Sequence, residues 1–234
     1  MESDHKICVI TGASSGIGYA IAKKLIERGH KIVVNARRKG KLEELESAVV
    51  IEGDLNDLDT LARIEKETYQ EFGRCDYLFN CAGIMEAGSI EDMDIEKMAM
   101  MLRLNTESTF RITYQFLKRF KKQGYGHVVN ISSILGTKVR PTTGPYAATK
   151  YAMEALSEAL RMELAGTNIY ISTIQPGLVM TELHNHWEVH PKDLFSIKSP
   201  LVPDDIAEAA LFIMDRPSHV SIPKIMVLPK EQAL

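Results

Sequence analysis

A tyrosine and a lysine stand four residues apart in the segment GPYAATKYAMEAL, residues 144–156. If this segment is helical, Tyr146 and Lys150 share one face, with Cβ atoms about 6 Å apart. A free phenol has a pKa of about 10, too high to exchange protons efficiently near neutral pH. An ammonium about 4 Å away, at an effective dielectric constant of about 20, lowers the pKa of the phenol by about three units. The pair therefore predicts a tyrosine that moves a proton, although plain packing would give the same spacing.

A glycine-rich turn near the N-terminus predicts a phosphate site. The stretch VITGASSGIGYAIAKKL, residues 9–25, joins a short apolar run to a helical pattern through Gly12, Gly16 and Gly18. Glycines permit a tight turn and a close backbone approach to a ligand, and the helix N-terminus offers free amides to a pyrophosphate. Surface turns are also rich in glycine, but this position, after the first strand and before the first helix, favours a nucleotide site.

The elements that must position these residues alternate along the chain. Continuous apolar runs predict strands that are covered on both faces. Repeated strand–helix–strand units predict an α/β fold of the Rossmann type: a doubly wound parallel sheet of about seven strands with helices on both faces, in three α/β/α layers. The strands are expected at 6–11, 31–36, 48–53, 77–82, 127–132, 169–174 and 222–228, and the helices at 17–28, 57–72, 94–122, 146–165 and 204–215.

One segment departs from this alternation. Residues 182–203 are irregular, aromatic and contain proline, and a connection of this length is typical of a functional loop or lid. No linker or repeat divides the rest, so we expect a single domain over residues 1–234 with this loop within it.

Composition excludes several classes of protein. The 234 residues are 45% hydrophobic and 25% charged, as in globular domains, and a net charge of −3 gives no electrostatic reason to expect nucleic acid or an anionic membrane as a partner. No apolar run approaches the length of a membrane span. Cys8, Cys75 and Cys81 are odd in number and widely spaced. They favour reduced thiols, and we expect a cytoplasmic protein.

Five motifs together resemble the short-chain dehydrogenase/reductase family. They are the G-x3-G-x-G turn at 12–18, NCAG at 80–83, NISS at 130–133, YAATK at 146–150 and QPGLVMT at 175–181, in the family's order and near its spacings. The resemblance implies hydride transfer between a nicotinamide dinucleotide and a substrate carbonyl or alcohol. Each motif is short, and it is their combination that is specific.

The resemblance also implies roles for four side chains. Tyr146 exchanges the proton with the substrate oxygen, and Ser133 steadies that oxygen. Lys150 binds the ribose and lowers the pKa of the tyrosine, while Asn105 holds a water that links the lysine to solvent. An asparagine satisfied within the core is the alternative for Asn105, which lies on an apolar helix face. Ser132 should point to the other side.

The end of the second predicted strand bears on the choice of dinucleotide. In this fold NAD enzymes place an acid there, whereas NADP enzymes place an arginine against the 2′-phosphate. The segment VVNARRKGK, residues 33–41, offers Arg37 and Arg38 and no acid. One charged hydrogen bond to the phosphate would favour NADP(H) by about ten- to a hundred-fold. A solvated basic turn is the alternative, and Ser15 stands where some NADP enzymes of the family have a basic residue.

The remaining cofactor contacts are implied by the resemblance. Asp54 resembles the acid that binds the adenine amino group, although it could instead cap the next helix, as Asn56 or Asp57 could. Val179, through its backbone, and Thr181 resemble the contacts to the nicotinamide carboxamide. The expected cofactor-binding residues are Gly12, Ser14, Ser15, Gly16, Ile17, Gly18, Arg37, Arg38, Asp54, Leu55, Asn80, Ala82, Gly83, Tyr146, Lys150, Pro176, Gly177, Val179 and Thr181.

The substrate walls are expected from 84–89, 134–143 and 182–203. Apolar surface would come from four side chains in these segments, namely Met85, Leu135, Leu183 and Trp187. Arg140 could anchor a substrate carboxylate, although arginines in such loops are more often solvated.

Three histidines in the last of these segments raise the question of a metal. His184, His186 and His190 match no closed structural zinc site, so we expect no metal.

The leading interpretation is an NADPH-dependent carbonyl reductase or alcohol dehydrogenase for a small molecule. The C-terminal stretch 218–232 is similar to family members that act on 3-hydroxy acids or serine. A 3-oxoacyl thioester reductase and a non-catalytic NADP-binding redox sensor are the alternatives, but a sensor would be expected to lack the tyrosine, lysine or serine. The helices at 94–122 and 146–165 are expected to pair across a two-fold axis in a homodimer or homotetramer.

Overall fold

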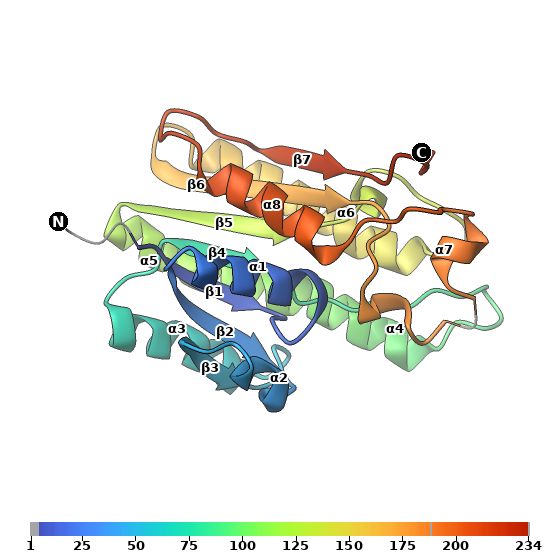
Figure 1. Ribbon diagram of the computed structural model, residues 1–234, viewed down its shortest axis with the longest axis horizontal. Coiled ribbons are helices and arrows are strands. Elements are labelled where there is room, and N and C mark those ends of the chain that lie inside the picture. Colours follow the sequence, from blue (N-terminus) through green and yellow to red (C-terminus); the bar gives the residue numbers. More distant parts are fainter. Residues whose placement is uncertain (1–4, 188, 234) are drawn as a thin grey trace.

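The computed structural model describes residues 5–187 and 189–233. Seven strands form one sheet in the order β3-β2-β1-β4-β5-β6-β7, and every neighbouring pair is parallel (Figure 1). Each strand begins and ends within two residues of its predicted bounds. The strands are β1 Ile7–Thr11, β2 Lys31–Ala36, β3 Ala48–Glu52, β4 Tyr77–Asn80, β5 Tyr125–Ile131, β6 Asn168–Pro176 and β7 Lys224–Val227.

Helices cover both faces of the sheet, which confirms the predicted doubly wound fold. The helices are α1 Gly16–Glu27, α2 Lys39–Glu43, α3 Leu58–Phe72, α4 Ile95–Leu102, α5 Thr109–Gln123, α6 Gly144–Glu163, α7 Pro191–Leu194 and α8 Pro203–Met214. In Figure 1, α1 and α8 lie in front of the sheet, and α3, α5 and α6 lie behind it. Alternate residues of β1 enter opposite cores: Ile10 packs into the front cluster and Val9 into the back one. Because both sets are buried, the strand is continuously apolar in sequence.

The predicted helix at 94–122 is not one regular helix. A π-helical turn, Arg103–Ser108, separates α4 from α5. Where this turn meets α5, the hydroxyl of Thr109 donates to the carbonyl of Leu104, five residues earlier, at 3.1 Å. Such bulges recur at functional sites because they redirect single side chains. Here the bulge includes Asn105, one of the predicted site residues.

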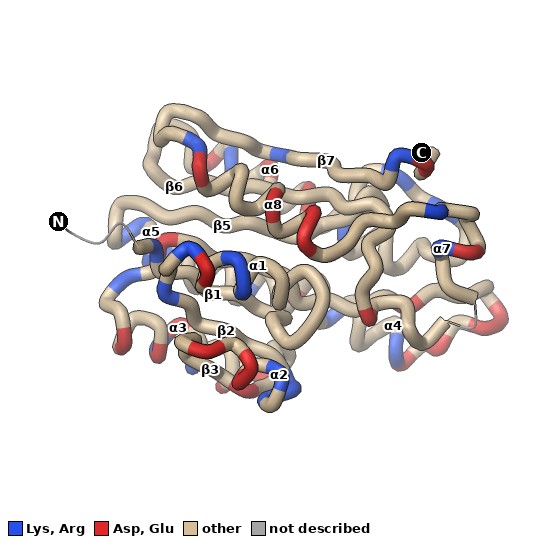
Figure 2. Tube along the Cα trace, in the orientation of Figure 1, with Lys and Arg blue, Asp and Glu red and all other residues tan. Residues whose placement is uncertain are grey.

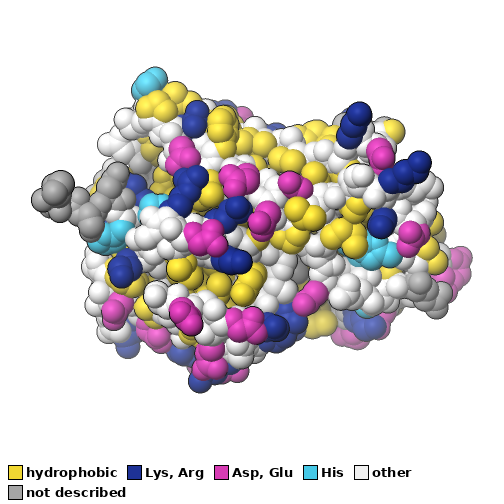
Figure 3. All heavy atoms as spheres, viewed as in Figure 1, with side chains coloured by type: hydrophobic (Ala, Val, Ile, Leu, Met, Phe, Trp, Pro, Cys, Tyr) yellow, Lys and Arg dark blue, Asp and Glu magenta, His cyan; other side chains and the backbone are white. Residues whose placement is uncertain are grey.

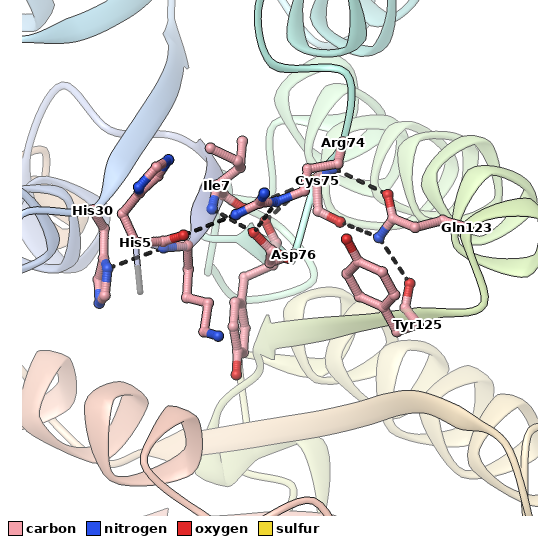
Figure 4. A network of polar contacts seen from close by, with 10 residues as sticks. His5, Ile7, His30, Arg74, Cys75, Asp76, Gln123 and Tyr125 are labelled. Atoms are coloured by element: carbon pink, nitrogen blue, oxygen red, sulfur yellow. Dashed lines mark hydrogen bonds and ion pairs between the residues drawn. The ribbon is translucent and has the colours of Figure 1, made fainter. Parts of the chain in front are cut away.

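The amino ends of the strands are fixed by a polar network (Figure 4). Asp76 accepts hydrogen bonds from the backbone of Ile7 at 2.6 Å and from Arg74 at 3.3 Å. Gln123 donates to the carbonyls of Cys75 at 2.6 Å and Tyr125 at 3.0 Å. These contacts join the start of β1 to the starts of β4 and β5. The carboxyl ends, where parallel α/β sheets bind ligands, lie at the opposite edge.

The segment 182–203 lies beyond these carboxyl ends, at the right of Figure 1. It contains a 3-10 turn, Glu182–His184, and the short helix α7. The C-terminal residues hold it: the carboxylate of Glu231 accepts from the backbone of Lys198 at 2.5 Å and of Ser199 at 3.1 Å.

Charges of both signs are interspersed along the chain (Figure 2), and neither sign forms a continuous field on the face drawn in Figure 3. Within the described part of the chain, no helix is both long and apolar enough to cross a membrane.

Candidate active site

The glycine turn has the shape of a phosphate cradle. Gly12 and Gly16 have φ values of 67° and 55°, in the left-handed region that side chains disfavour. A Cβ atom at Gly12 would lie 2.7 Å from the backbone of Ala82, and one at Gly18 would lie 2.5 Å from the carbonyl oxygen of Gly12. The spacing of the three glycines therefore follows from the close fit of this turn to the end of β4. The backbone amides at the start of α1 remain available to an anion.

Tyr146 and Lys150 lie on the first turns of α6, as predicted, and both are buried, with 6% and 5% of their surfaces exposed. The Lys150 ammonium donates to the carbonyl oxygen of Ile131 at 2.9 Å and lies 5.7 Å from the centre of the Tyr146 ring. The hydroxyl group of Ser133, the second residue after β5, accepts from the backbone of Leu135 at 3.1 Å and interacts with the phenol of Tyr146, whose pKa it lowers. The phenol, the amine and the hydroxyl thus meet at the carboxyl end of β5.

Burial dominates the titration of this group. It raises the pKa of Tyr146 to about 12, an effect that the hydrogen bond from Ser133 partly opposes. Burial also lowers the pKa of Lys150 to about 8, an effect that the neighbouring Cys81 and Glu154 only partly oppose. The predicted depression of the Tyr146 pKa by Lys150 is therefore wrong for this structure, because burial raises that pKa and only the interaction with Ser133 lowers it.

Ser132 directly precedes Ser133, and its pointing to the other side stays a prediction. Its buried hydroxyl has no hydrogen-bond partner within the described residues and lies on the side of Gly136, where a Cβ would be 2.8 Å away.

Asn105 is fully buried and its amide is engaged. Its carbonyl accepts from the backbone of Ile84 at 3.0 Å, and its amino group donates to the carbonyl of Ile84 at 2.8 Å and to the hydroxyl of Thr149 at 3.3 Å. A Cβ at Gly83 would lie 3.3 Å from the Asn105 carbonyl and 3.9 Å from Lys150 Nζ, so the amide is a neighbour of the lysine. Asn105 thus holds the segment after β4 against α6. The water that would link it to Lys150 stays a prediction.

The carboxylate of Asp54 is free of contacts that would prevent its expected role, a hydrogen bond to the adenine amino group, among the residues that the structure describes. Asp57 caps α3 by accepting from the backbone of Asp59 and Thr60, so Asp54 is not needed as a helix cap. The carboxylate of Asp54 accepts only a local bond, from the backbone of Asn56 at 2.9 Å, among the contacts found in the described residues.

The strand end at 80–83 borders the turn through its backbone. The side chain of Asn80 turns into the core, where it donates to Thr113 at 2.9 Å and to Asn130 at 2.8 Å. The hydroxyl of Thr11 accepts from the backbone of Cys81 and Ala82 and holds this segment beside β1.

The QPGLVMT motif passes over the glycine turn from the other side. Val179 forms a parallel bridge with Leu201, and Gly177 donates to the carbonyl of Val227 at 2.7 Å. The methyl group of Thr181 would lie 3.1 Å from a Cβ at Gly16. The predicted residues of the first and last motifs are therefore in contact.

Arg38 has a partner that sequence reasoning missed. Its guanidinium lies 2.7 Å from the carboxylate of Glu182 and donates to the hydroxyl of Ser14 at 3.3 Å. The hydrogen bond from Arg38 lowers the pKa of Glu182, and Ser15 contributes in the same direction. The only sequence signal was that Glu182 follows Thr181 directly, at the end of a recognised motif. Arg37, the neighbouring candidate, is exposed.

The substrate side is mostly apolar. Tyr146 belongs to a cluster drawn from all three predicted walls, which includes Met85, Leu135, Leu183 and Trp187. The guanidinium of Arg140 lies over the ring of Phe195, at 4.6 Å from its centre, and donates to the carbonyl of Ala233 at 3.5 Å. It thus braces the loop and the C-terminal residues.

The three histidines of the 182–203 segment lie near one another. His184 is buried against Trp187 and His190, and burial lowers its pKa to about 4. His186 lies 3.8 Å from the carboxylate of Glu86. Over the residues that the structure describes, no group of three His, Cys, Asp or Glu is placed to hold a metal ion.

Comparison with known proteins assigns this geometry to a family. A model of the family described as short chain dehydrogenase matches residues 6–191. An uncharacterized oxidoreductase of Staphylococcus saprophyticus is 32% identical over 238 residues, which cover 98% of this chain and 99% of that protein. The chain therefore belongs to the short-chain dehydrogenase family of oxidoreductases.

Solved structures agree with this assignment. The closed form of a serine dehydrogenase complexed with NADP+ has a TM-score of 0.91 at 26% identity, covering 97% of this chain and 96% of that chain. A 3-ketoacyl-(acyl-carrier-protein) reductase from Brucella melitensis complexed with NADH has a TM-score of 0.87 at 26% identity, covering 97% and 98%. Both neighbours thus bind a nicotinamide dinucleotide, which carries the 2′-phosphate in the first structure and lacks it in the second.

Proposed function

We propose that this oxidoreductase transfers a hydride between NADP(H) and a small carbonyl or secondary alcohol substrate, with Tyr146 exchanging the proton of the substrate oxygen. The observation that carries the proposal is the meeting of the buried Tyr146 and Lys150 with the half-buried Ser133 at the carboxyl end of β5. A phenol whose pKa is raised to about 12 stays protonated at ordinary pH, which suits a proton donor in carbonyl reduction.

The other two side chains would assist the tyrosine. The Ser133 hydroxyl lies close enough to the phenol to lower its pKa, so one substrate oxygen could contact both groups. Lys150 would place a positive charge beneath the site and bind the cofactor ribose. Its pKa of about 8 means that it keeps most of that charge at neutral pH. Asn105 would position the lysine by holding the segment at Gly83 and Ile84.

The residues present fit a dinucleotide with a 2′-phosphate. A Cβ at Gly12 would collide with the backbone of Ala82, and one at Gly18 with the carbonyl oxygen of Gly12, so only glycine keeps the tight turn that precedes the helix N-terminus where a pyrophosphate would bind. Arg38 already holds one anion, the carboxylate of Glu182, and also donates to the hydroxyl of Ser14, so its guanidinium is placed for an oxyanion at the glycine turn. When bound, the cofactor would supply the hydride. The NADH-bound neighbour leaves NAD(H) as the alternative cofactor.

The substrate side favours an uncharged ketone or aldehyde. Apolar side chains surround Tyr146, and Glu86 adds a negative charge to one wall. A 3-hydroxy acid is the second candidate, favoured by the likeness to serine dehydrogenase. It would need a cation for its carboxylate, and Arg140 could serve only by leaving Phe195. A 3-oxoacyl thioester is the third, on the likeness to the ketoacyl reductase.

We further propose that residues 1–234 form one catalytic domain in which 182–203 is the substrate loop. Leu183 and Trp187, from this loop, pack against the cluster of Tyr146. Homodimers or homotetramers would bring together the exposed aromatic residues of α5 and α6, Tyr114 and Tyr151. Light scattering of the purified protein tests the assembly.

A panel of ketones, aldehydes, 3-hydroxy acids and 3-oxoacyl thioesters, followed through NADPH absorbance, tests the activity. Turnover of an uncharged ketone or aldehyde with NADPH, at a kcat/KM at least about tenfold above that with NADH, is the expected result. No turnover of any member of the panel with either cofactor, despite NADPH binding, would support a redox sensor instead.

A further inference from the structure

The carboxylate of Glu182 lies where the proposed cofactor phosphate would be held. Its oxygen is 2.7 Å from the Arg38 guanidinium, which also donates to Ser14 at 3.3 Å, and Ser15 adds a further hydrogen bond to the same carboxylate. An arginine and two serine hydroxyls at a glycine turn are the donors that a phosphate oxygen requires. The Arg38 guanidinium thus has two candidate anions, the carboxylate of Glu182 and the cofactor phosphate, with the hydroxyls of Ser14 and Ser15 beside it.

These two anions exclude each other. A carboxylate and a phosphate on the same donors would repel at short range. The contact is also easily exchanged, because the side chains of Arg38 and Glu182 are 50% and 51% exposed. An ion pair this exposed shifts an equilibrium by no more than about five-fold, so a cofactor phosphate could displace it.

Glu182 is the first residue of the 182–203 segment, and its neighbours connect it to the substrate side. Thr181, before it, packs on Gly16 and caps the turn by accepting from the backbone of Leu183 at 3.3 Å. The turn continues to Trp187, whose backbone donates to the carbonyl of His184 at 3.0 Å. Leu183 and Trp187 contact the Tyr146 cluster. A displacement of Glu182 would therefore move Leu183 and Trp187, which form part of the wall of the substrate site.

We propose that Glu182 competes with the 2′-phosphate of the cofactor for Arg38, so that a 2′-phosphorylated nucleotide detaches the start of the 182–203 segment and an unphosphorylated one does not. The inference rests on the proposed NADP(H) function and adds to it a coupling between the two ends of the site. The adenosine end would then report to the substrate end which cofactor has bound.

The effect of the 2′-phosphate can be measured by comparing two small nucleotides that differ in this group. Adenosine 2′,5′-bisphosphate carries it, and 5′-AMP lacks it but keeps the 5′-phosphate. Titration calorimetry measures the affinity of each for the wild type, for Glu182→Gln and for Glu44→Gln. Glu44 is a matched control, because it pairs with Lys41 at 2.8 Å beside the same end of the site and its side chain is 49% exposed.

We expect Glu182→Gln to bind the bisphosphate about three- to five-fold more tightly than the wild type, with no change for 5′-AMP. Glu44→Gln should match the wild type with both. An equal gain in Glu44→Gln would mean that general charge is responsible and would overturn the inference. Thermal unfolding of Glu182→Gln, and a Glu182→Asp variant that keeps the charge on a shorter arm, check that the fold is retained.

The chain has a single tryptophan, and it lies in this segment, so its fluorescence reports on the loop. Trp187 emission in the wild type should change on adding the bisphosphate and not 5′-AMP. Before any nucleotide is added, the Trp187 emission of Glu182→Gln should already equal that of the wild type with the bisphosphate bound. Tight binding of the bisphosphate with identical affinity and emission in both proteins would overturn the inference and leave the NADP preference standing. Equal affinities of the wild type for bisphosphate and 5′-AMP would overturn the preference itself, and the inference with it.

Discussion

The ammonium of Lys150 lies 5.7 Å from the centre of the Tyr146 ring and donates its hydrogen bond to the carbonyl oxygen of Ile131 at 2.9 Å. Both side chains are buried, so each pays a desolvation cost for its charged form. The phenol therefore holds its proton, and the amine holds its charge less firmly than an exposed lysine does. The pH dependence and the stability of the protein should both reflect this.

Carbonyl reduction should be independent of pH below the pKa of Lys150 and fall above it. The pKa of this amine is lowered to about 8, so its positive charge is lost as the pH rises through that value, while Tyr146 remains protonated. The rate kcat measured between pH 6 and 10 with saturating NADPH tests this. A rate that continued to rise to pH 10 would show that the reaction uses the deprotonated amine or the phenolate.

Lys150→Met should give a more stable protein that has lost its activity. A lysine that titrates near 10.5 when unfolded and at about 8 when folded destabilises the fold at neutral pH by up to about 3 kcal/mol. Between those two values the unfolded chain binds more protons, so wild-type stability rises with pH. Urea unfolding at pH 7 and pH 10 should show this rise in the wild type and a smaller one in Lys150→Met. If the variant were less stable than the wild type at both pH values, the buried Lys150 would stabilise the fold, which would contradict this prediction.

Arg38→Ala should weaken NADPH use and leave NADH use nearly unchanged. The guanidinium is the proposed partner of the 2′-phosphate, and losing a charged hydrogen bond costs about 1.5–3 kcal/mol, or about ten- to a hundred-fold in kcat/KM. Lys39→Ala is the control, because Lys39 is a neighbouring exposed cation that pairs with Glu43. Equal losses with NADPH and NADH would show that Arg38 supports the fold of the turn and does not select the phosphate.

Gly18→Ala and Gly40→Ala form a pair that separates close fit from helix propensity. A Cβ at Gly18 would lie 2.5 Å from the carbonyl oxygen of Gly12, whereas one at Gly40, in α2, meets nothing within 4 Å. We expect Gly18→Ala to lose NADPH binding and stability, and Gly40→Ala to gain up to about 1 kcal/mol. Thermal unfolding with and without NADPH measures both. A neutral Gly18→Ala would mean that the turn has room to relax.

The parts of the site that sequence predicted are those written in short segments. Gly12, Gly16 and Gly18 stand in one turn, and Tyr146 and Lys150 in one helix, so local spacing was enough to place them. The strands could be predicted equally well, because residues such as Val9 and Ile10 are buried in two different cores, so the strand is continuously apolar in sequence.

The parts that sequence did not predict depend on distant segments. The contact of Arg38 with Glu182 joins residues 144 positions apart, and no local pattern marks it. The raised pKa of Tyr146 comes from its burial among residues of α4, the 84–87 segment and the 182–203 loop, which only the packed chain brings together. The π-helical turn at Asn105 inserts a wider turn that a search for regular helical spacing passes over.

The most direct test of the account is the turnover of Tyr146→Phe on the best substrate of the panel, with NADPH binding measured in the same preparation. NADPH should bind with wild-type affinity and kcat should fall by about a thousandfold, because only the hydroxyl that carries the proton is lost. A variant that binds NADPH normally and retains a tenth or more of wild-type kcat would contradict the assignment of the proton to Tyr146.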